Sequence, residues 1–136
     1  MSNLHLKIVT PEKMIYDESV SSVNISTESG QIGILPNHVN LMAKLEPGEL
    51  IIKNGAKIES MAIGDGFLQV SKNTLTVMTD LATYVQDLDE KVLEEAKKRA
   101  QEALSKTLTD EEYAETLSSL EKSLAQLRIK RRHRVR

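Results

Sequence analysis

The chain of 136 residues contains no cysteine, no tryptophan and a single phenylalanine. The lack of cysteine excludes disulfide frameworks, thiolate catalysis and cysteine metal sites, and it fits a reducing compartment. No apolar run approaches the roughly 20 residues that a membrane helix requires, and the N-terminus has no charged-then-apolar leader. These features predict a cytosolic protein. Because 40% of the residues are hydrophobic and only 3% are aromatic, the sequence also predicts a small globular fold with an aliphatic core.

Catalytic and metal-binding patterns are also missing. The histidines His5, His38 and His133 lie far apart in the chain, and no HExxH or paired-carboxylate spacing accompanies them. Residues 30–33 and 64–66 are rich in glycine, but neither segment continues into a helix as GxGxxG or GK[ST], so we interpret both as turns. No catalytic constellation is therefore visible, and we expect no metal or hydrolytic site.

The net charge of −2 hides an uneven distribution of charge. Residues 87–127 carry six basic and eleven acidic side chains, whereas residues 128–136, RIKRRHRVR, carry six arginines and lysines and no acidic residue. We call residues 128–136 the cationic tip. It suits an acidic patch on a protein partner, the phosphates of a nucleic acid or the negative end of a helix dipole. The lack of interleaved aromatic residues and the acidic remainder of the chain favour the protein partner.

Short strands are predicted up to about Gln86. Apolar residues there follow period two or form short blocks, at Leu4–Ile8, Val23–Ile25, Leu50–Ile52, Lys57–Ile63, Phe67–Val70 and Leu75–Met78. Turn residues fall between these blocks, at Gly55, at residues 64–66 and at residues 71–73. This spacing is typical of a small antiparallel β-sandwich or barrel.

The segment from Gly30 to Leu50, GQIGILPNHVNLMAKLEPGEL, is the most unusual in the chain. Its glycines and Pro36 predict an irregular or bulged edge strand that carries Ile32, Ile34 and Leu35, and Pro47-Gly48 predicts a second turn. Because an open apolar edge promotes aggregation, a natural protein usually covers it with a partner. This segment therefore indicates a subunit of an assembly.

At Asp87 the hydrophobic period changes from two to about 3.6, which predicts a β domain over residues 1–86 and a helical domain over residues 87–136. We expect Asp87 to be the N-cap of a first helix with Glu90 at N3, and we expect this helix to end near Ser105-Lys106. Its predicted apolar stripe is Leu88, Val92, Ala96, Ala100 and Leu104.

A second helix should begin at Thr109, which forms a capping box with Glu112. Its predicted stripe is Tyr113, Leu117, Leu120, Leu124 and Leu127. The same steps continue to positions 131 and 134, which are both arginine, so the packing seam becomes basic. Two helices joined by a short loop form an antiparallel hairpin, and the fold class is therefore α+β.

Several segments together closely resemble the ε subunit of F-type ATP synthase, of the bacterial type. They are IVTPEK (residues 8–13), the segment from Gly30 to Leu50, GDGFLQV (residues 64–70), LTVMTDLA (residues 75–82) and QDLD (residues 86–89). The resemblance implies a noncatalytic rotor subunit that couples c-ring and γ rotation to ATP synthesis in the αβ head. It also implies a peripheral position at the cytoplasmic face of the bacterial inner membrane, with the plastid thylakoid membrane as the alternative.

The resemblance further implies two groups of contact residues. The contacts with γ and the c-ring would be made by Gln31, Ile32, Gly33, Ile34, Leu35, Pro36, His38 and Leu41, although the family often has an acidic residue where Gln31 stands. His38 has an equally simple interpretation as a turn histidine. The helical hairpin would act as a brake on ATP hydrolysis when it extends along γ. Its inhibitory contacts with the α/β head would be made by Lys122, Arg128, Lys130, Arg131 and Arg132.

Some bacterial relatives bind ATP on the hairpin through a segment of the form [IL]DxxRA. Leu88 and Asp89 match its first two positions, but Val92 and Leu93 replace the Arg-Ala pair. The resemblance therefore predicts weak or absent ATP binding and no other cofactor, with Arg99 and Arg128 as the side chains that could compensate. Two other functions stay open, a free-standing nucleotide sensor and a basic-tailed nucleic-acid-binding protein.

Overall fold

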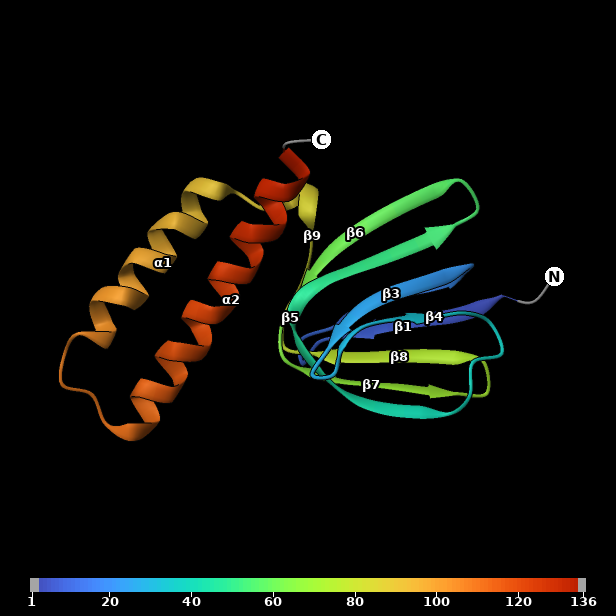
Figure 1. The fold of residues 1–136 in the computed structure, drawn as a ribbon, viewed down its shortest axis with the longest axis horizontal. Helices are drawn as coiled ribbons and strands as arrows, with labels where there is room; N and C mark the ends of the chain where they lie inside the picture. The colour runs from blue at the N-terminus through green and yellow to red at the C-terminus, as the bar shows by residue number, and fades with distance from the viewer. Residues whose placement is uncertain (1–2, 135–136) are drawn as a thin grey trace. The chain divides into compact units, whose positions relative to one another are not determined.

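The computed structural model describes residues 3–134, and of Arg134 the backbone alone. The chain divides into two compact units, Met1–Tyr84 and Val85–Arg136. The first unit consists of β-strands and the second of helices (Figure 1). The hydrophobic period changes at Asp87, three residues after the end of the first unit. A short 3-10 turn occupies these three residues and precedes the first α-helix.

The first unit is a curled β-sandwich. Its strands are β1 (Leu4–Val9), β2 (Met14–Val20), β3 (Ser22–Thr27), β4 (Gly30–Ile34), β5 (Leu41–Asn54), β6 (Lys57–Ile63), β7 (Gly66–Ser71), β8 (Thr74–Thr79) and β9 (Ala82–Tyr84). The strands pair in the order β2-β1-β8-β7-β5-β3-β4, and β6 joins β5 to β9. Among the described strands only β1 and β8 run parallel. The predicted α+β class is confirmed.

Strand β5 belongs to both layers of the sandwich, and it corrects one prediction. Its residues Leu41–Leu45 pair with β7, and its residues Gly48–Asn54 pair with β6. The ladder between β3 and β5 shifts register where Thr27 faces Leu45 and Ile25 faces Leu50. The predicted turn at Pro47-Gly48 is therefore wrong, since both residues lie inside the continuous strand β5, which bends from one layer to the other.

The residues at this bend suit an interrupted ladder. Pro47 has no N–H to donate, so it is tolerated where strand pairing is broken by a bulge. A Cβ atom on Gly48 would lie 2.6 Å from the Oγ atom of Ser26, which leaves room for glycine alone without a shift of that side chain. The turn signal of the sequence thus marks a sheet corner.

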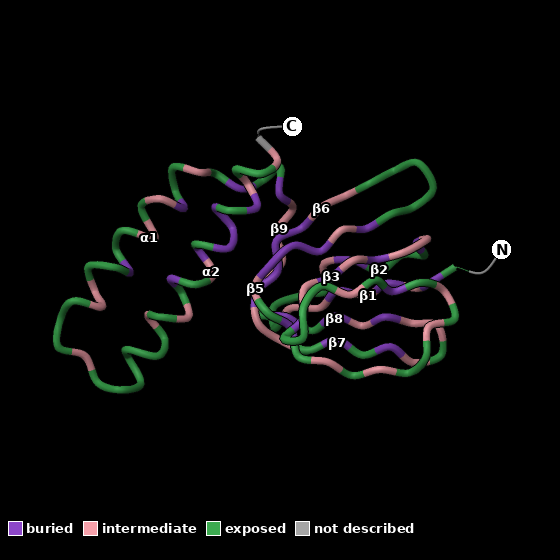
Figure 2. Tube along the Cα trace, in the orientation of Figure 1, coloured by how far each residue is buried: buried purple, intermediate pink, exposed green. Residues whose placement is uncertain are grey.

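The core of the sandwich is aliphatic, as predicted. Buried and less buried residues alternate along β1 and β8 (Figure 2), because successive side chains of a strand point to opposite faces. The largest fully buried side chains are Leu4, Leu6, Ile8, Ile25, Ile34, Leu45, Leu50, Ile52, Met61, Ile63, Leu68 and Leu75. Strand β2 was not predicted, because only Tyr16 and Val20 of its seven residues are buried and its centre is polar.

Strand β4 lies at an edge of the sheet and pairs with β3, which confirms the predicted edge strand. Its pairing from Gly30 to Ile34 is regular, so the predicted bulge is absent from this ladder. The register shift occurs on the other side of β3, opposite β5. Leu35 follows the strand and is not part of it.

The second unit contains the 3-10 turn η1 (Val85–Asp87) and the helices α1 (Glu90–Leu104) and α2 (Asp110–Arg134), which lie side by side as a hairpin (Figure 1). The N-cap of α1 is Asp89, whose carboxylate accepts a hydrogen bond from the Lys91 N–H at 2.9 Å. The predicted cap at Asp87 is therefore wrong, because Asp87 ends η1. The helix still ends at Leu104, as predicted.

The later start of α1 also changes its buried face. Leu93 and Ala100 are buried, whereas Val92 is 56% exposed, so Val92 does not belong to the packed stripe. On α2, Leu120 and Leu127 are buried, but Tyr113, Leu117 and Leu124 of the predicted stripe are exposed. The buried side of α2 includes Ser123, a small polar residue that a stripe of apolar residues leaves out.

The capping box at the start of α2 is confirmed. The Thr109 N–H donates to the carboxylate of Glu112 at 3.2 Å, and the Glu112 N–H donates to the Thr109 hydroxyl at 3.1 Å. These reciprocal bonds satisfy backbone donors that a helix start leaves unpaired. They also lower the pKa of Glu112, first through the Thr109 side chain and then through the Thr109 backbone.

Candidate partner surfaces

The predicted contact segment covers β4 and the loop that follows it. Gln31, Gly33 and Leu35 are exposed, and four further residues are half-buried, namely Ile32, Pro36, His38 and Leu41. Ile34 is fully buried and belongs to the core, so its side chain is not available to a partner. The predicted segment therefore combines one core residue with seven that reach the surface.

The loop after β4 projects two apolar side chains. Leu35 is 62% exposed and Val39 is 75% exposed, and we call residues 35–39 the projecting loop. Inside it, the His38 N–H donates to the Leu35 carbonyl at 3.2 Å, and His38 Nδ1 donates to the Val39 carbonyl at 2.8 Å. The side chain of His38 thus has a local backbone partner, as expected of a turn histidine.

A second apolar surface crosses the sandwich and was not found from the sequence. Phe67 of β7 stands directly opposite Lys44 of β5 and Met78 of β8. Met78 in turn faces Val9 of β1, and Val9 faces Met14 of β2. We call Val9, Met14, Phe67 and Met78 the outer apolar row.

The outer apolar row is open to solvent. Met14 is 50% exposed, Phe67 52% and Met78 41%. An open hollow of about 510 Å³ lies beside Val9, Phe67 and Met78, and it is lined also by Pro11 and Lys44. The alternation around Leu68 and Val77 predicts that Phe67 and Met78 point outward. The register that aligns Met78 with Val9 depends on pairing of β8 with the distant strand β1.

The two surfaces lie at opposite ends of the same strands. Phe67 is near the start of β7, and Met78 is near the end of β8. Because these strands are antiparallel, both residues lie at the same end of the ladder. The Ser71–Thr74 turn closes the other end, and Asn73 in that turn hydrogen bonds to Asn37 of the projecting loop at 2.7 Å. The sandwich therefore separates two exposed apolar surfaces along the length of a strand.

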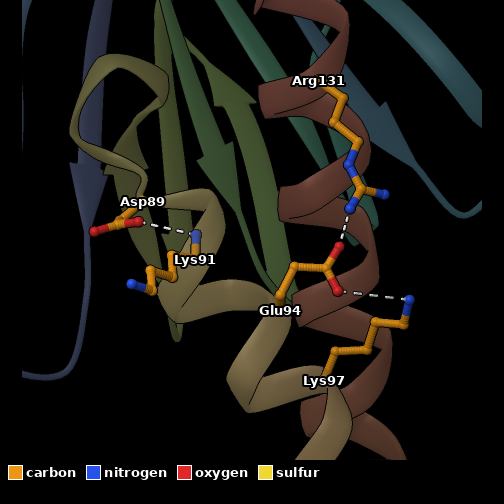
Figure 3. Close-up of polar contacts among 5 residues, drawn as sticks. All are labelled: Asp89, Lys91, Glu94, Lys97 and Arg131. Atoms are coloured by element: carbon orange, nitrogen blue, oxygen red, sulfur yellow. Dashed lines mark hydrogen bonds and ion pairs between the residues drawn. The ribbon is translucent and has the colours of Figure 1, made fainter.

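Two residues of the cationic tip are engaged inside the hairpin. Lys130 Nζ donates to the Val85 carbonyl of η1 at 3.1 Å. The guanidinium of Arg131 pairs with the carboxylate of Glu94 on α1, and Lys97 Nζ lies 3.9 Å from the same carboxylate (Figure 3). As the basic seam predicts, Arg131 lies toward the sibling helix.

The other residues predicted for inhibition differ in exposure. Arg128 and Arg132 are exposed, and Lys122 is half-buried. The side chain of Arg134 lies outside the described residues. The tip thus presents some basic side chains to solvent while Lys130 and Arg131 are bound within the hairpin.

The candidate ATP residues have separate roles in the described structure. Leu88 is buried, and the Asp89 carboxylate caps α1 (Figure 3). Arg99 and Arg128 are both exposed. Within residues 3–134, no hydrogen bond or ion pair between any two of these four residues was found.

Among the described residues, no three histidine, aspartate or glutamate side chains come together in a way that suits a metal ion. The described part of the chain also contains no helix that is long and apolar enough to cross a membrane.

Comparison with known families identifies the chain. Residues 3–85 match the family described as ATP synthase, Delta/Epsilon chain, beta-sandwich domain. The chain belongs to this family. The predicted relationship to the ε subunit is confirmed, and an ε subunit is a noncatalytic stalk subunit.

Relatives within the family match nearly the full chain. The ATP synthase epsilon chain of Thioalkalivibrio sulfidiphilus is 38% identical over 127 residues, which cover 92% of this chain and 90% of the relative. That of Alkalilimnicola ehrlichii is 36% identical over 138 residues, which cover 100% of this chain and 98% of the relative. The similarity to ε chains thus extends through the helical hairpin.

Solved structures share the fold at lower identity. A chain in the Euglena gracilis mitochondrial ATP synthase structure, which contains OSCP, F1 and the c-ring, has a TM-score of 0.77 and 23% identity over 92% of this chain and 79% of that one. A chain in the central stalk and c-ring structure from Tetrahymena thermophila has a TM-score of 0.66 and 16% identity over 93% and 96%. The fold is therefore shared with these two chains at low sequence identity.

Proposed function

We propose that this ε-type chain is a rotor subunit of an F-type, proton-translocating ATP synthase. It couples rotation of the c-ring and the γ subunit to ATP synthesis, and it inhibits ATP hydrolysis through its C-terminal helices. The observation that carries the proposal is the presence of two exposed apolar surfaces at opposite ends of one rigid sandwich. A subunit between two partners needs a separate surface for each.

The outer apolar row is the proposed contact with γ. Exposed apolar surfaces that include aromatic and methionine side chains are typical of protein interfaces. Phe67 and Met78 are neighbours in the row, and Lys44, which faces Phe67 at the end of the row, provides a polar rim. Burial of this row by γ removes apolar area from water and stabilises the complex.

The exposed part of β4 and the projecting loop are the proposed contact with the c-ring. Leu35 is exposed just after the end of β4, Gln31 is exposed near the start of β4, and the unpaired edge of β4 provides further backbone donors and acceptors. With this contact, the subunit would lie peripherally at the membrane that holds the c-ring. The predicted membrane, the bacterial inner membrane at its cytoplasmic face or alternatively the plastid thylakoid membrane, is part of this proposal.

Inhibition is assigned to the hairpin and its cationic tip. Arg128 and Arg132 are exposed, and Lys130 and Arg131 would join them when the hairpin extends and its internal contacts separate. Together with Lys122 they would meet an acidic region of the α/β head. Charge pairs of this kind steer association and weaken as salt rises.

The single experiment that tests the proposal combines the γ contact with inhibition. Full-length chain, residues 1–86 alone, and the variants F67D and M78D are added to an αβγ complex, and affinity and ATP hydrolysis are measured. We expect F67D and M78D each to weaken binding by about tenfold or more, because a charge within an apolar interface loses its hydration when the interface closes. The control variant I58D changes an apolar residue that is 63% exposed and lies outside the row, and it should bind normally.

Residues 1–86 should bind αβγ and lack inhibition, whereas the full-length chain should bind and inhibit. Wild-type affinity of both F67D and M78D would exclude the outer apolar row as the γ contact. Equal hydrolysis with the full-length chain and with residues 1–86 would exclude the inhibitory role of the hairpin. Membership of the ATP synthase family disfavours the two free-standing alternatives, nucleotide sensing and nucleic-acid binding.

A further inference from the structure

The side chain of Asn73 connects segments that are far apart in the sequence. Its Oδ1 atom accepts a hydrogen bond from the Asn37 N–H at 2.7 Å, and its Nδ2 atom donates to the Asn3 carbonyl at 2.6 Å. Its backbone carbonyl also accepts from the His5 N–H at 3.0 Å. Asn73 therefore joins the projecting loop, the start of the chain and the turn between β7 and β8.

The turn itself does not require this side chain. Ser71 pairs with Thr74, and the two residues between them have positive φ, 50° at Lys72 and 61° at Asn73. A two-residue hairpin turn of this kind accepts glycine at either position. The asparagine side chain thus adds two hydrogen bonds that a glycine could not make. Asparagine and glycine both suit the backbone conformation of this turn.

The two partners also define the orientation of the Asn73 amide. Its carbonyl oxygen faces a backbone N–H and its NH₂ group faces a backbone carbonyl, so each end of the amide has the partner it needs. Asn37 is itself at a positive φ of 65°, in the left-handed region that asparagine tolerates better than most residues other than glycine. The bond from Asn73 reaches the loop at this left-handed residue.

We propose that Asn73 is a positioning residue for the contact with the c-ring, an inference that rests on the function proposed above. It holds the projecting loop in its binding conformation, with Leu35 and Val39 exposed, before the partner arrives. A loop that is ordered in advance loses less conformational entropy on binding and therefore binds more tightly. Asn73 contributes to affinity without touching the partner.

The test compares N73G with the matched control K72G in the full-length chain. Both variants place glycine at a positive φ in the same turn, so their effects on backbone entropy are similar. Hydrogen exchange of the Asn37 amide is measured on the free chain, and affinity is measured for γ alone and for a γ–c-ring complex. Only N73G removes the bond to Asn37.

We expect N73G to speed exchange at Asn37 and to weaken binding to the γ–c-ring complex, each by about fivefold, the factor that corresponds to one typical hydrogen bond. K72G should leave both unchanged, and neither variant should alter the affinity for γ alone. N73D retains an acceptor for the Asn37 N–H, so exchange at Asn37 should stay slow even though the donor to Asn3 is lost.

Unchanged exchange at Asn37 in N73G would overturn the positioning role whatever the partner is. Equal losses of affinity in N73G and K72G would overturn it as well, because the turn and not the side chain would then be responsible. Faster exchange with unchanged affinity for the γ–c-ring complex would show that the loop is ordered but does not contact the c-ring. Failure of the wild-type chain to bind γ would instead reject the rotor assignment itself.

Discussion

Arg131 on α2 pairs with Glu94 on α1 and so closes the hairpin at the end that carries the cationic tip (Figure 3). The neighbouring Lys130 binds the Val85 carbonyl of η1. Both basic residues are also among those assigned to the inhibitory contact. In the proposed inhibitory state, the hairpin's own groups would therefore compete with the α/β head for these side chains.

Removal of this competition should strengthen inhibition. The E94Q variant takes away the carboxylate that holds Arg131, and because both side chains are 44% exposed the pair contributes no more than about 1 kcal/mol. We expect half-maximal inhibition of ATP hydrolysis at a concentration about two- to fivefold lower than for the wild type. The control is E95Q, which changes the neighbouring exposed carboxylate. Unchanged or weaker inhibition by E94Q would refute the competition.

Loss of the capping box should loosen the start of α2. The T109A variant removes the hydroxyl that accepts from the Glu112 N–H, a change that typically costs about 1 kcal/mol at an N-cap. Amide exchange in the first turn of α2 should accelerate, as measured by NMR. T109S should preserve protection, and T107A, a change at an exposed threonine before the cap, should have no effect. Equal effects of T107A and T109A would argue against the box.

The same box should respond to acid. Hydrogen bonds from Thr109 lower the pKa of Glu112 below its ordinary value of 4.5, so the carboxylate is favoured in the folded state. The stabilisation is complete above the ordinary pKa and is lost as the pH falls through the lowered pKa. An NMR titration of the Glu112 carboxyl, with exchange in the first turn followed in parallel, measures this. E112Q should keep the turn without the pH dependence, since glutamine also completes a capping box.

Two glycines should differ sharply in their tolerance of a methyl group. Gly66 has a φ of 153°, and a Cβ atom there would lie 1.9 Å from the Met78 carbonyl oxygen, whereas Gly55 at a φ of 64° faces open space. We expect G55A to cost about 1–2 kcal/mol from the left-handed backbone alone. G66A should cost about 3 kcal/mol or more, because strain and the backbone clash add. Hydrogen exchange of the buried amides of β7 and β8 measures both, and similar losses would contradict the expected clash.

ATP should bind weakly or not at all. Val92 and Leu93 stand where an Arg-Ala pair would supply the cation, and the Asp89 carboxylate is occupied as the N-cap of α1. Calorimetry with Mg-free ATP at micromolar concentrations should give no binding isotherm. D89N, which preserves a good N-cap, should behave like the wild type. A clear isotherm for the wild-type chain would disprove this prediction.

The features that the sequence by itself determined are local. Period two between Leu4 and Ile8 specifies which side chains enter the core, and Thr109 and Glu112 form their capping box within one helical turn. The ordered motifs identified the family and led to the prediction that the segment around Gln31 and the basic residues of the tip make contacts. The strand pattern and the capping box need only backbone geometry and side chains that are close together in the sequence.

Only the tertiary structure decided the rest. Pro47-Gly48 has the composition of a turn, yet it forms a sheet corner because β5 must pair with different strands on either side of it. The outer apolar row and the bridge from Asn73 to Asn37 depend on registers between segments far apart in the chain. These registers follow from packing of the whole core, since a shift of one residue would turn every buried side chain of a strand toward water.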